Sequence, residues 1–330
     1  MVVIDPLSSG DLDSLKPLWL EECSRRTALA QDIALTHESE TSWSILKQRF
    51  QAALNNGGGY VASEAGCVVG FAVWQDERMP WPAAFATPPR FAEVLSLTIA
   101  RDNGGGNIGI RLLNAIEQAA NGRNFRELMV SLLAADEGAR AFFEKQGYMP
   151  KWLMLTCFRQ ELSLPAIDGS LVEPVDLFEV DALEPVWVSV HHVHRAVAPQ
   201  LAPFVSDAET WRVYSRTFRP SAEQGLLFRV GPNKTPLAMG CASMLEDHSR
   251  LTDVWNVDGP IAEIEVLAAL PSERGKRHGL RLMTRLRDVL RARGIPNLVI
   301  GVVAANSDAI RIYRRWGFQP ALLQLTKWCG

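Results

Sequence analysis

The chain has 330 residues, of which 47% are hydrophobic, and its formal net charge is −3. This content is enough to bury two cores, while the small charge argues against nucleic acid or an anionic membrane as a partner. The chain does not open with a basic region and an apolar run, and no apolar stretch approaches the ~18 residues that span a bilayer, so we expect a cytoplasmic protein without a signal peptide.

Both halves of the chain show the same predicted order of elements. In the first half these are a strand at 1–5, a helical region at 11–54, a hairpin at 59–74, a strand at 92–100, a helix at 109–120, a strand at 128–133, a helix at 137–145 and a final turn at 147–148. In the second half they are 171–173, 179–220, 226–244, 262–270, 279–293, 298–303, 307–315 and 317–318. The order predicts a mixed α/β sheet with helices on both faces.

The repeated order reflects a duplication. Positions 92–150 are identical to the residues 170 positions later at 14 of 59 places, where composition alone would give about three or four. The offset is 168 nearer the start, as from Trp43 to Trp211, so the second half has two extra residues, which we place in the turn-rich string 231–236. The duplication predicts two domains, 1–165 and 168–330, joined by a short linker of turn residues.

A loop rich in Gly and Arg follows the strand at 262–270 and precedes a helix. It reads Arg274-x-x-Arg277-x-Gly279. Free N–H groups and the dipole at a helix start favour an anion there, and Gly279 allows a ligand to approach the backbone closely. Further along the chain come Asn306, Tyr313 and Gly317-Phe318 at fixed spacing.

This combination resembles the GNAT superfamily of acyl-CoA-dependent N-acetyltransferases, whose loop is Gln/Arg-x-x-Gly-x-Gly/Ala. Here Arg277 replaces the middle glycine, which adds a cation. The resemblance implies two tandem GNAT domains, each with a sheet splayed open between its fourth and fifth strands, and acetyl-CoA as cosubstrate without a metal. It implies that the acetyl-CoA-binding residues are Leu267, Ala268, Ala269, Arg274, Gly275, Lys276, Arg277, His278, Gly279 and Asn306.

Two roles in that set have competing interpretations. The backbone N–H of either Leu267 or Ala268 is the expected oxyanion donor, because the strand is expected to bend open there. Asn306 could contact CoA, or it could simply cap the following helix, as Asp136 would in the first half.

Three residues are candidates for the chemistry of acyl transfer. The phenol of Tyr313 can protonate a departing thiolate. Glu263 and Glu265 lie two apart on a predicted strand and therefore share a face, where each raises the pKa of the other. Either could be the general base, although Glu93 occupies the position of Glu263 in the first half and could make that residue structural in both copies.

The first half keeps the scaffold but departs from the second half at the candidate site. Gly104 and Asn107 stand at the positions of Arg274 and Arg277, and Phe143 stands at the position of Tyr313. These differences predict a degenerate first domain and a catalytic second domain. The alternative is divergence with function retained, in which both halves act on different acceptors.

The acceptor has no recognisable motif. His191, His192 and His194 belong to the second half alone, and their spacing fits a metal site poorly, so a polar helix face or a contact with the acceptor is preferred. The five scattered cysteines predict free thiols.

From the family resemblance we expect a monomer or homodimer that acetylates a primary amine of a small molecule or peptide. A catalytically silent acyl-CoA sensor or assembly module is the alternative from another class.

Overall fold

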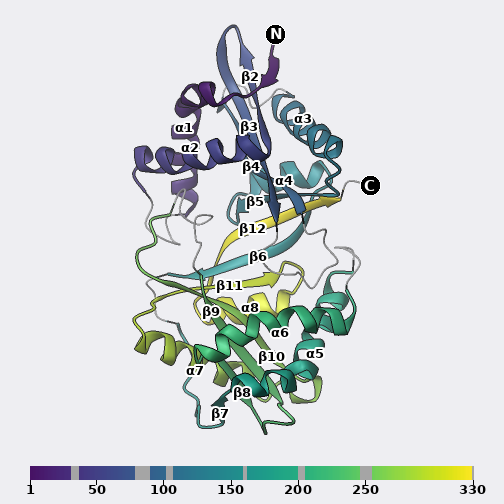
Figure 1. The fold of residues 1–330 in the computed structure, drawn as a ribbon. Coiled ribbons are helices and arrows are strands. Elements are labelled where there is room, and N and C mark those ends of the chain that lie inside the picture. The colour runs from purple at the N-terminus through teal and green to yellow at the C-terminus, as the bar shows by residue number, and fades with distance from the viewer. Residues whose placement is uncertain are drawn as a thin grey trace.

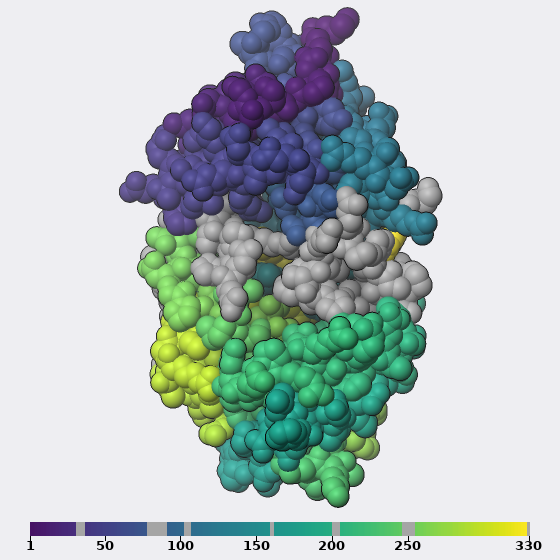
Figure 2. All heavy atoms as spheres, in the orientation of Figure 1, coloured from purple at the N-terminus to yellow at the C-terminus, as the bar shows by residue number. Residues whose placement is uncertain are grey.

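A single mixed sheet runs through the molecule. The computed structural model describes residues 1–30, 37–78, 90–101, 107–158, 162–199, 205–245 and 255–328. These residues form one sheet of 12 strands, with the first half of the chain in one lobe and the second half in the other (Figures 1 and 2). Across the same ranges, no helix has the length and apolar character needed to cross a membrane.

Both halves contain the predicted order of helices and strands. In the first half the elements are β1 (Val3–Pro6), α1 (Lys16–Ala30), α2 (Ser39–Asn56), β2 (Gly58–Glu64), β3 (Cys67–Arg78), β4 (Arg90–Ile99), α3 (Ile108–Gly122), β5 (Glu127–Leu133), α4 (Glu137–Lys145) and β6 (Met149–Cys157). In the second half they are β7 (Val172–Pro174), α5 (Glu184–Val197), α6 (Asp207–Glu223), β8 (Leu227–Val230), β9 (Ala238–Met244), β10 (Ile261–Ala269), α7 (His278–Ala292), β11 (Asn297–Val303), α8 (Ser307–Arg315) and β12 (Gln319–Trp328). The prediction of a mixed α/β fold built twice is confirmed.

The last strands of the two halves are exchanged. The strand order is β1-β2-β3-β4-β5-β12-β6-β11-β10-β9-β8-β7. Thus β12, from the end of the chain, pairs with β5 of the first half, and β6 pairs with β11 of the second half. The two exchanged strands also pair with each other at the centre of the sheet (Figure 1). Each lobe therefore contains one strand from the other half of the chain.

Amphipathic helices cover the two faces of the sheet and create the cores. On α7, Leu282, Leu286 and Leu290 recur at four-residue spacing and are fully buried. They pack with β10 and β11 residues such as Ile264 and Ile300 in one core of the second half. The helices α5 and α6 cover the opposite face, where Trp187 and Phe218 pack with Val266 of β10. Because side chains of a strand point to alternate faces, these two cores show which face of the sheet each β10 side chain lies on.

In each half, the fourth and fifth strands pair only at their beginnings. The parallel ladder between β10 and β11 runs from Ile261–Asn297 to Ile264–Ile300, although β10 continues to Ala269. The ladder between β4 and β5 has three pairs, from Ala92–Leu128 to Val94–Val130. The expected splay between these strands is therefore present in both halves, and it leaves an edge of β4 and of β10 unpaired.

The prediction that the two extra residues lie in the turn 231–236 is wrong. The hairpin pairs Tyr60 with Ala72 in the first half and Phe228 with Gly240 in the second, so the two hairpins have equal length. The extra residues fall between β9 and β10. The match of Gly70 to Gly240 at offset 170 misled the alignment, because their positions in the ladder differ by two residues.

A buried ion pair lies where the exchanged strands meet the first half. Lys151 of β6 donates to the carboxylate of Glu127 at the start of β5, at 2.5 Å, and both side chains are at most 2% exposed. Thr326 of β12 donates to the same carboxylate oxygen at 2.6 Å. Burial lowers the pKa of Lys151, and the Glu127 charge opposes that shift. One polar cluster thus ties both exchanged strands to β5.

Candidate functional site

The two candidate carboxylates lie on β10 at a bulge. Glu263 pairs with Ser243 of β9 and with Val299 of β11, while Glu265 is the extra residue where the register shifts between Ile264 and Val266. The ladder with β11 ends at this point. A bulge bends the strand and re-aims its side chains, so the two carboxylates flank the start of the opening.

Burial raises the pKa of both carboxyl groups, and repulsion from Glu265 adds to the effect on Glu263. Burial is the larger cause for Glu263, and with the nearby Glu265 it raises the pKa of Glu263 to about 8. Burial also raises the pKa of Glu265, against the opposing effect of Ser243, which donates a hydrogen bond to Glu265 at 2.6 Å. Ser243 was missed from the sequence, because only the strand register brings it to the pair.

The loop before α7 presents unbonded backbone amides. Gly275 and Arg277 both have left-handed φ values, of 82° and 63°. The first helical bond runs from Arg281 N–H to the Arg277 carbonyl, and in the described part of the chain the N–H groups of Gly275 and of 277–280 bond to no acceptor. The replacement of the middle glycine by Arg277 thus preserves the backbone conformation that a glycine would favour. The loop fits an anionic phosphate group.

The side chains of this loop divide into two groups. Lys276 donates to Glu273 at 2.9 Å, and the His278 ring lies 3.1 Å from the other Glu273 oxygen. These two bonds lower the pKa of Glu273. Arg274 and Arg277 are exposed and, among the described residues, form no ion pair. Lys276 and His278 therefore brace the loop through Glu273, while the two arginines have no such contact among the described residues.

The ladder with β9 distinguishes the two candidate oxyanion donors. Leu270 N–H donates to the Leu237 carbonyl at 2.9 Å. Because hydrogen-bonded pairs alternate in an antiparallel ladder, Ala268 is in such a pair with Met239 and directs its N–H toward β9. Leu267 and Ala269 direct their N–H groups to the unpaired side of β10. This geometry favours Leu267 over Ala268.

Tyr313 lies on α8, on the opposite face of the sheet from the carboxylates. It packs against the same core as Leu267 and Ala269, with ring centroids 5.9 Å from Trp316 and 6.2 Å from Phe318. Burial raises the pKa of Tyr313 to about 12, so the phenol stays protonated at neutral pH. Within the described residues its hydroxyl has no hydrogen-bond partner. The opening between β10 and β11 is the route between the two faces.

Asn306 caps α8. Its Oδ1 accepts a hydrogen bond from Ala309 N–H at 3.2 Å, as Asp136 Oδ1 does from Ala139 N–H at 3.0 Å in the first half. The capping interpretation is therefore correct for Asn306, and its side-chain N–H₂ group is the part left for a ligand.

The three histidines of α5 have separate surroundings. His191 is buried and lies 2.9 Å from the Val205 carbonyl, and His192 is exposed and lies 2.9 Å from Asp207. Burial is the larger cause that lowers the pKa of His194 to about 4, so its ring is neutral. No cluster of metal-binding side chains occurs in the ranges that the structure covers.

The first half lacks the same arrangement. Glu93 accepts a hydrogen bond from Gln75 at 3.0 Å, and Leu95 occupies the bulge position of Glu265. Phe143 is buried against Phe142 and Tyr148, with centroids 5.1 and 5.2 Å away. The loop residue Gly104 lies outside the described residues, so that part of the comparison stays a prediction.

Ion pairs also occupy the corresponding region of the first half. Arg25 of α1 lies 2.7 Å from the capping residue Asp136 of α4, and it bonds to Glu22 as well. Arg101, at the end of β4, lies 2.9 Å from Glu21. In the second half Val193 stands at the position of Arg25. In the first half, α1 is thus joined by ion pairs to the start of α4 and to the segment that follows β4.

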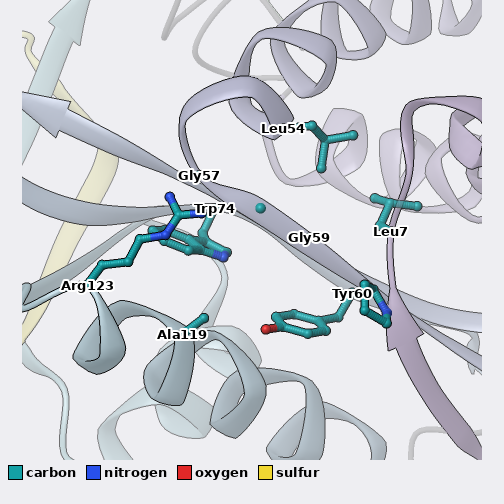
Figure 3. Close-up of a pocket in the computed structure, with 10 residues that line it drawn as sticks. Leu7, Leu54, Gly57, Gly59, Tyr60, Trp74, Ala119 and Arg123 are labelled. Carbon is teal, nitrogen blue, oxygen red and sulfur yellow. The ribbon is translucent and has the colours of Figure 1, made fainter.

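A pocket of about 210 Å³ lies elsewhere in the first half (Figure 3). Its wall is the Trp74 indole, over which the Arg123 guanidinium stacks at 5.0 Å. The other labelled lining residues are Leu7, Leu54, Gly57, Gly59, Tyr60 and Ala119. The Trp74 N–H is sealed from solvent and the pocket holds no carboxylate, so it offers no acyl-transfer chemistry.

The fold and site agree with a known family of enzymes. Residues 22–148 and 188–318 each match the acetyltransferase (GNAT) family. The chain belongs to this family, as a tandem of two GNAT domains, and it is an N-acetyltransferase. The four cysteines in the described ranges are free, as expected, and Cys329 lies outside those ranges.

Two relatives with assigned names match either most of the chain or about a third of it. A mycothiol acetyltransferase of Acidothermus cellulolyticus is 26% identical over 273 residues, covering 79% of each chain. Another, of Brachybacterium faecium, is 32% identical over 125 residues, covering 34% of this chain and 38% of the relative. A GCN5-related N-acetyltransferase from Sphaerobacter thermophilus has the same fold, with a TM-score of 0.56 at 14% identity and coverage of 99% and 95%.

Proposed function

We propose that the second half transfers the acetyl group of acetyl-CoA to a primary amine, and that the first half is a structural partner. The observation that carries this proposal is the opening beside β10. It has a carboxylate pair at its start, the free loop amides before α7 at its far end and the Tyr313 phenol on the opposite face. The free amides and the exposed Arg274 and Arg277 suit the CoA phosphates.

The proposed reaction is direct attack of the amine on the thioester. The amine nitrogen forms a bond to the carbonyl carbon, and its proton passes to the Glu263/Glu265 pair, with Glu263 as base and Glu265 as the neighbour that raises the pKa of Glu263. Leu267 N–H donates to the developing oxyanion. As the carbon–sulfur bond breaks, Tyr313 donates its proton to the leaving sulfur.

Differences between the two halves support the proposal that only the second half transfers acetyl groups. It has Leu95 in place of Glu265 and Phe143 in place of Tyr313. Its only carboxylate at the equivalent strand position among the described residues, Glu93, is held by Gln75. Arg25 of α1 forms an ion pair with Asp136, the capping residue of α4, whereas Val193 stands at the position of Arg25 in the second half. We therefore propose that this half does not transfer acetyl groups.

An acceptor screen tests the function. Purified full-length protein is incubated with acetyl-CoA and a panel of amines, amino sugars, amino acids and peptides, with release of the CoA thiol as readout. The panel includes the acceptor of mycothiol acetyltransferases, because two relatives carry that name. At least one acceptor should release thiol in proportion to N-acetyl product. Tight CoA binding with no product across the panel would instead favour a silent acyl-CoA sensor.

The pH profile should report the carboxylate pair. Because the base must be deprotonated and the pKa of Glu263 is raised to about 8, log kcat/KM should rise with pH below about 8 and level off above it. In Glu263→Gln the activity should fall about 100-fold and the rise attributed to this group should disappear. Glu93→Gln is the matched control and should leave the profile unchanged. An unaltered profile in Glu263→Gln would exclude this residue as base.

A further inference from the structure

The exchanged strand β6 brings a first-half tryptophan to the second-half site. Trp152 pairs with Val303 of β11, and its indole lies directly over Gly301 two residues away. A Cβ on Gly301 would lie 2.8 Å from Cε2 of that indole, which is closer than real contacts allow. The absence of a side chain at Gly301 therefore leaves the space that the Trp152 indole occupies, and a larger residue there would displace the ring.

The strand register puts this indole next to the carboxylate pair. Glu263 pairs with Val299, and the ladder ends one residue later at Ile264–Ile300. The next residues on the two strands are Glu265 and Gly301. Paired residues of parallel strands share a face and side chains alternate along each strand, so Gly301 and its indole cover lie on the face of Glu263.

The helix α5 closes the other side of the indole. The His194 ring lies 6.2 Å from the Trp152 ring, edge to face at 78°. The helix itself contacts the end of β10, where Ser189 donates to the Ala269 carbonyl at 3.5 Å. Trp152 remains partly exposed, and within the described residues its indole N–H has no hydrogen-bond partner. The strand register thus places an uncharged aromatic ring on the same face of the sheet as Glu263.

We propose that Trp152 is a wall of the acceptor site, and that with Glu263 and Glu265 it selects a primary ammonium whose neighbouring groups carry no negative charge. This inference rests on the proposed function and adds its substrate class. The face of an indole attracts cations, and the carboxylates attract the ammonium before taking its proton. A second carboxylate beside the amine, as in an α-amino acid, would be repelled by the same pair.

The first half supplies the contrast. In the first lobe, the exchanged strand β12 has Leu322 at the position of Trp152, while Ser131 and Leu95 stand at the positions of Gly301 and Glu265. Ser131 accepts a hydrogen bond from Gln324 of β12 at 3.4 Å instead of lying under an aromatic ring. The first lobe, to which we assign no chemistry, therefore has neither an aromatic residue at the position of Trp152 nor a second carboxylate at the position of Glu265.

The class of acceptor is tested with a matched pair of compounds. At pH 8, 2-phenylethylamine and phenylalanine differ only in the carboxylate beside the amine. The intact protein should prefer 2-phenylethylamine by about 100-fold in kcat/KM, and Glu265→Gln should reduce that preference at least tenfold. Equal use of the two compounds by the intact protein would overturn the charge selection.

The role of Trp152 is tested by changing it to the residue of the other half. Trp152→Leu should raise the KM for 2-phenylethylamine at least tenfold while leaving the affinity for CoA within twofold, and Trp152→Phe should retain most of the affinity for the amine. Gly301→Ala should raise the same KM, but add little in the Trp152→Leu background, because both changes act on one ring. Equal KM values for intact protein and Trp152→Leu would overturn the proposal, as would parallel loss of CoA binding.

A binding measurement separates this proposal from the proposed function. If the intact protein acetylates no amine, the transferase proposal fails, and the acceptor wall is then judged by calorimetric titration of the CoA-loaded protein with 2-phenylethylamine. Binding that Trp152→Leu abolishes and Leu322→Ala preserves would support the wall. Absence of binding to the intact protein would overturn it.

Discussion

Replacing Tyr313 with phenylalanine is expected to lower kcat at least about 100-fold, while the affinity for acetyl-CoA changes less than about threefold. The hydroxyl is the only group removed, and it has no hydrogen-bond partner among the described residues, so the fold loses no polar contact. Its aromatic packing against Trp316 and Phe318 is kept by phenylalanine. Turnover measured by thiol release and affinity measured by calorimetry separate the two effects.

Tyr60→Phe is the matched control for this change. It removes the same hydroxyl group from β2 in the first half, far along the sheet from β10. We expect its turnover to stay within twofold of the unaltered protein. If Tyr313→Phe also keeps full turnover, the phenol is not the acid, whereas an equal loss of acetyl-CoA affinity would make Tyr313 a binding residue.

Breaking the ion pair between Glu127 and Lys151 is expected to lower the free energy of unfolding by about 3–5 kcal/mol. Either Glu127→Gln or Lys151→Met leaves one charge buried without its partner, next to Thr326 of β12. Because the pair joins β5 to both exchanged strands, the loss should appear in both lobes. Urea denaturation followed by tryptophan fluorescence measures it.

Removing both charges together should restore most of that stability. In the second half, Asn297 and Ala321 stand at the positions of Glu127 and Lys151, and Asn297 donates to the Asp258 carbonyl at 2.7 Å instead. Uncharged residues at these two positions are therefore compatible with this fold. The exposed pair Arg140–Glu144 is the control, and Glu144→Gln should cost less than about 1 kcal/mol. A double variant as unstable as Lys151→Met would show that the charges are needed beyond their mutual pairing.

The order of elements was predictable from the sequence because it depends on local pattern, whereas the splay was expected from the family resemblance. Leu282 and Leu286 on one face of α7 reveal the helix, and the duplication allowed each half to check the other. The exchange of β6 and β12 was not predictable. The two strands occupy equivalent positions in their halves, so no local pattern says which half each will join.

Local sequence pattern does not reveal strand partners, and this also explains which residues near the candidate site were missed. Glu263, Glu265 and Tyr313 were predicted from spacing, because strand alternation and helix position are local properties. Ser243 and Trp152 come from partners chosen by register and strand exchange, and only the three-dimensional arrangement brings them to β10. The choice between Leu267 and Ala268 likewise needed the phase of the ladder with β9.

The number of CoA sites per chain tests the central claim most directly. Calorimetric titration of the full-length protein with CoA should give one site, because the cations Arg274 and Arg277 belong to the second half, whereas Gly104 and Asn107 stand at their positions in the first. The double variant Arg274→Ala/Arg277→Ala should weaken that site about 100-fold, at about tenfold per arginine, whereas Arg101→Ala should not change it. Two sites of similar affinity, or one site that survives loss of both arginines, would contradict the assignment of the working site to the second half.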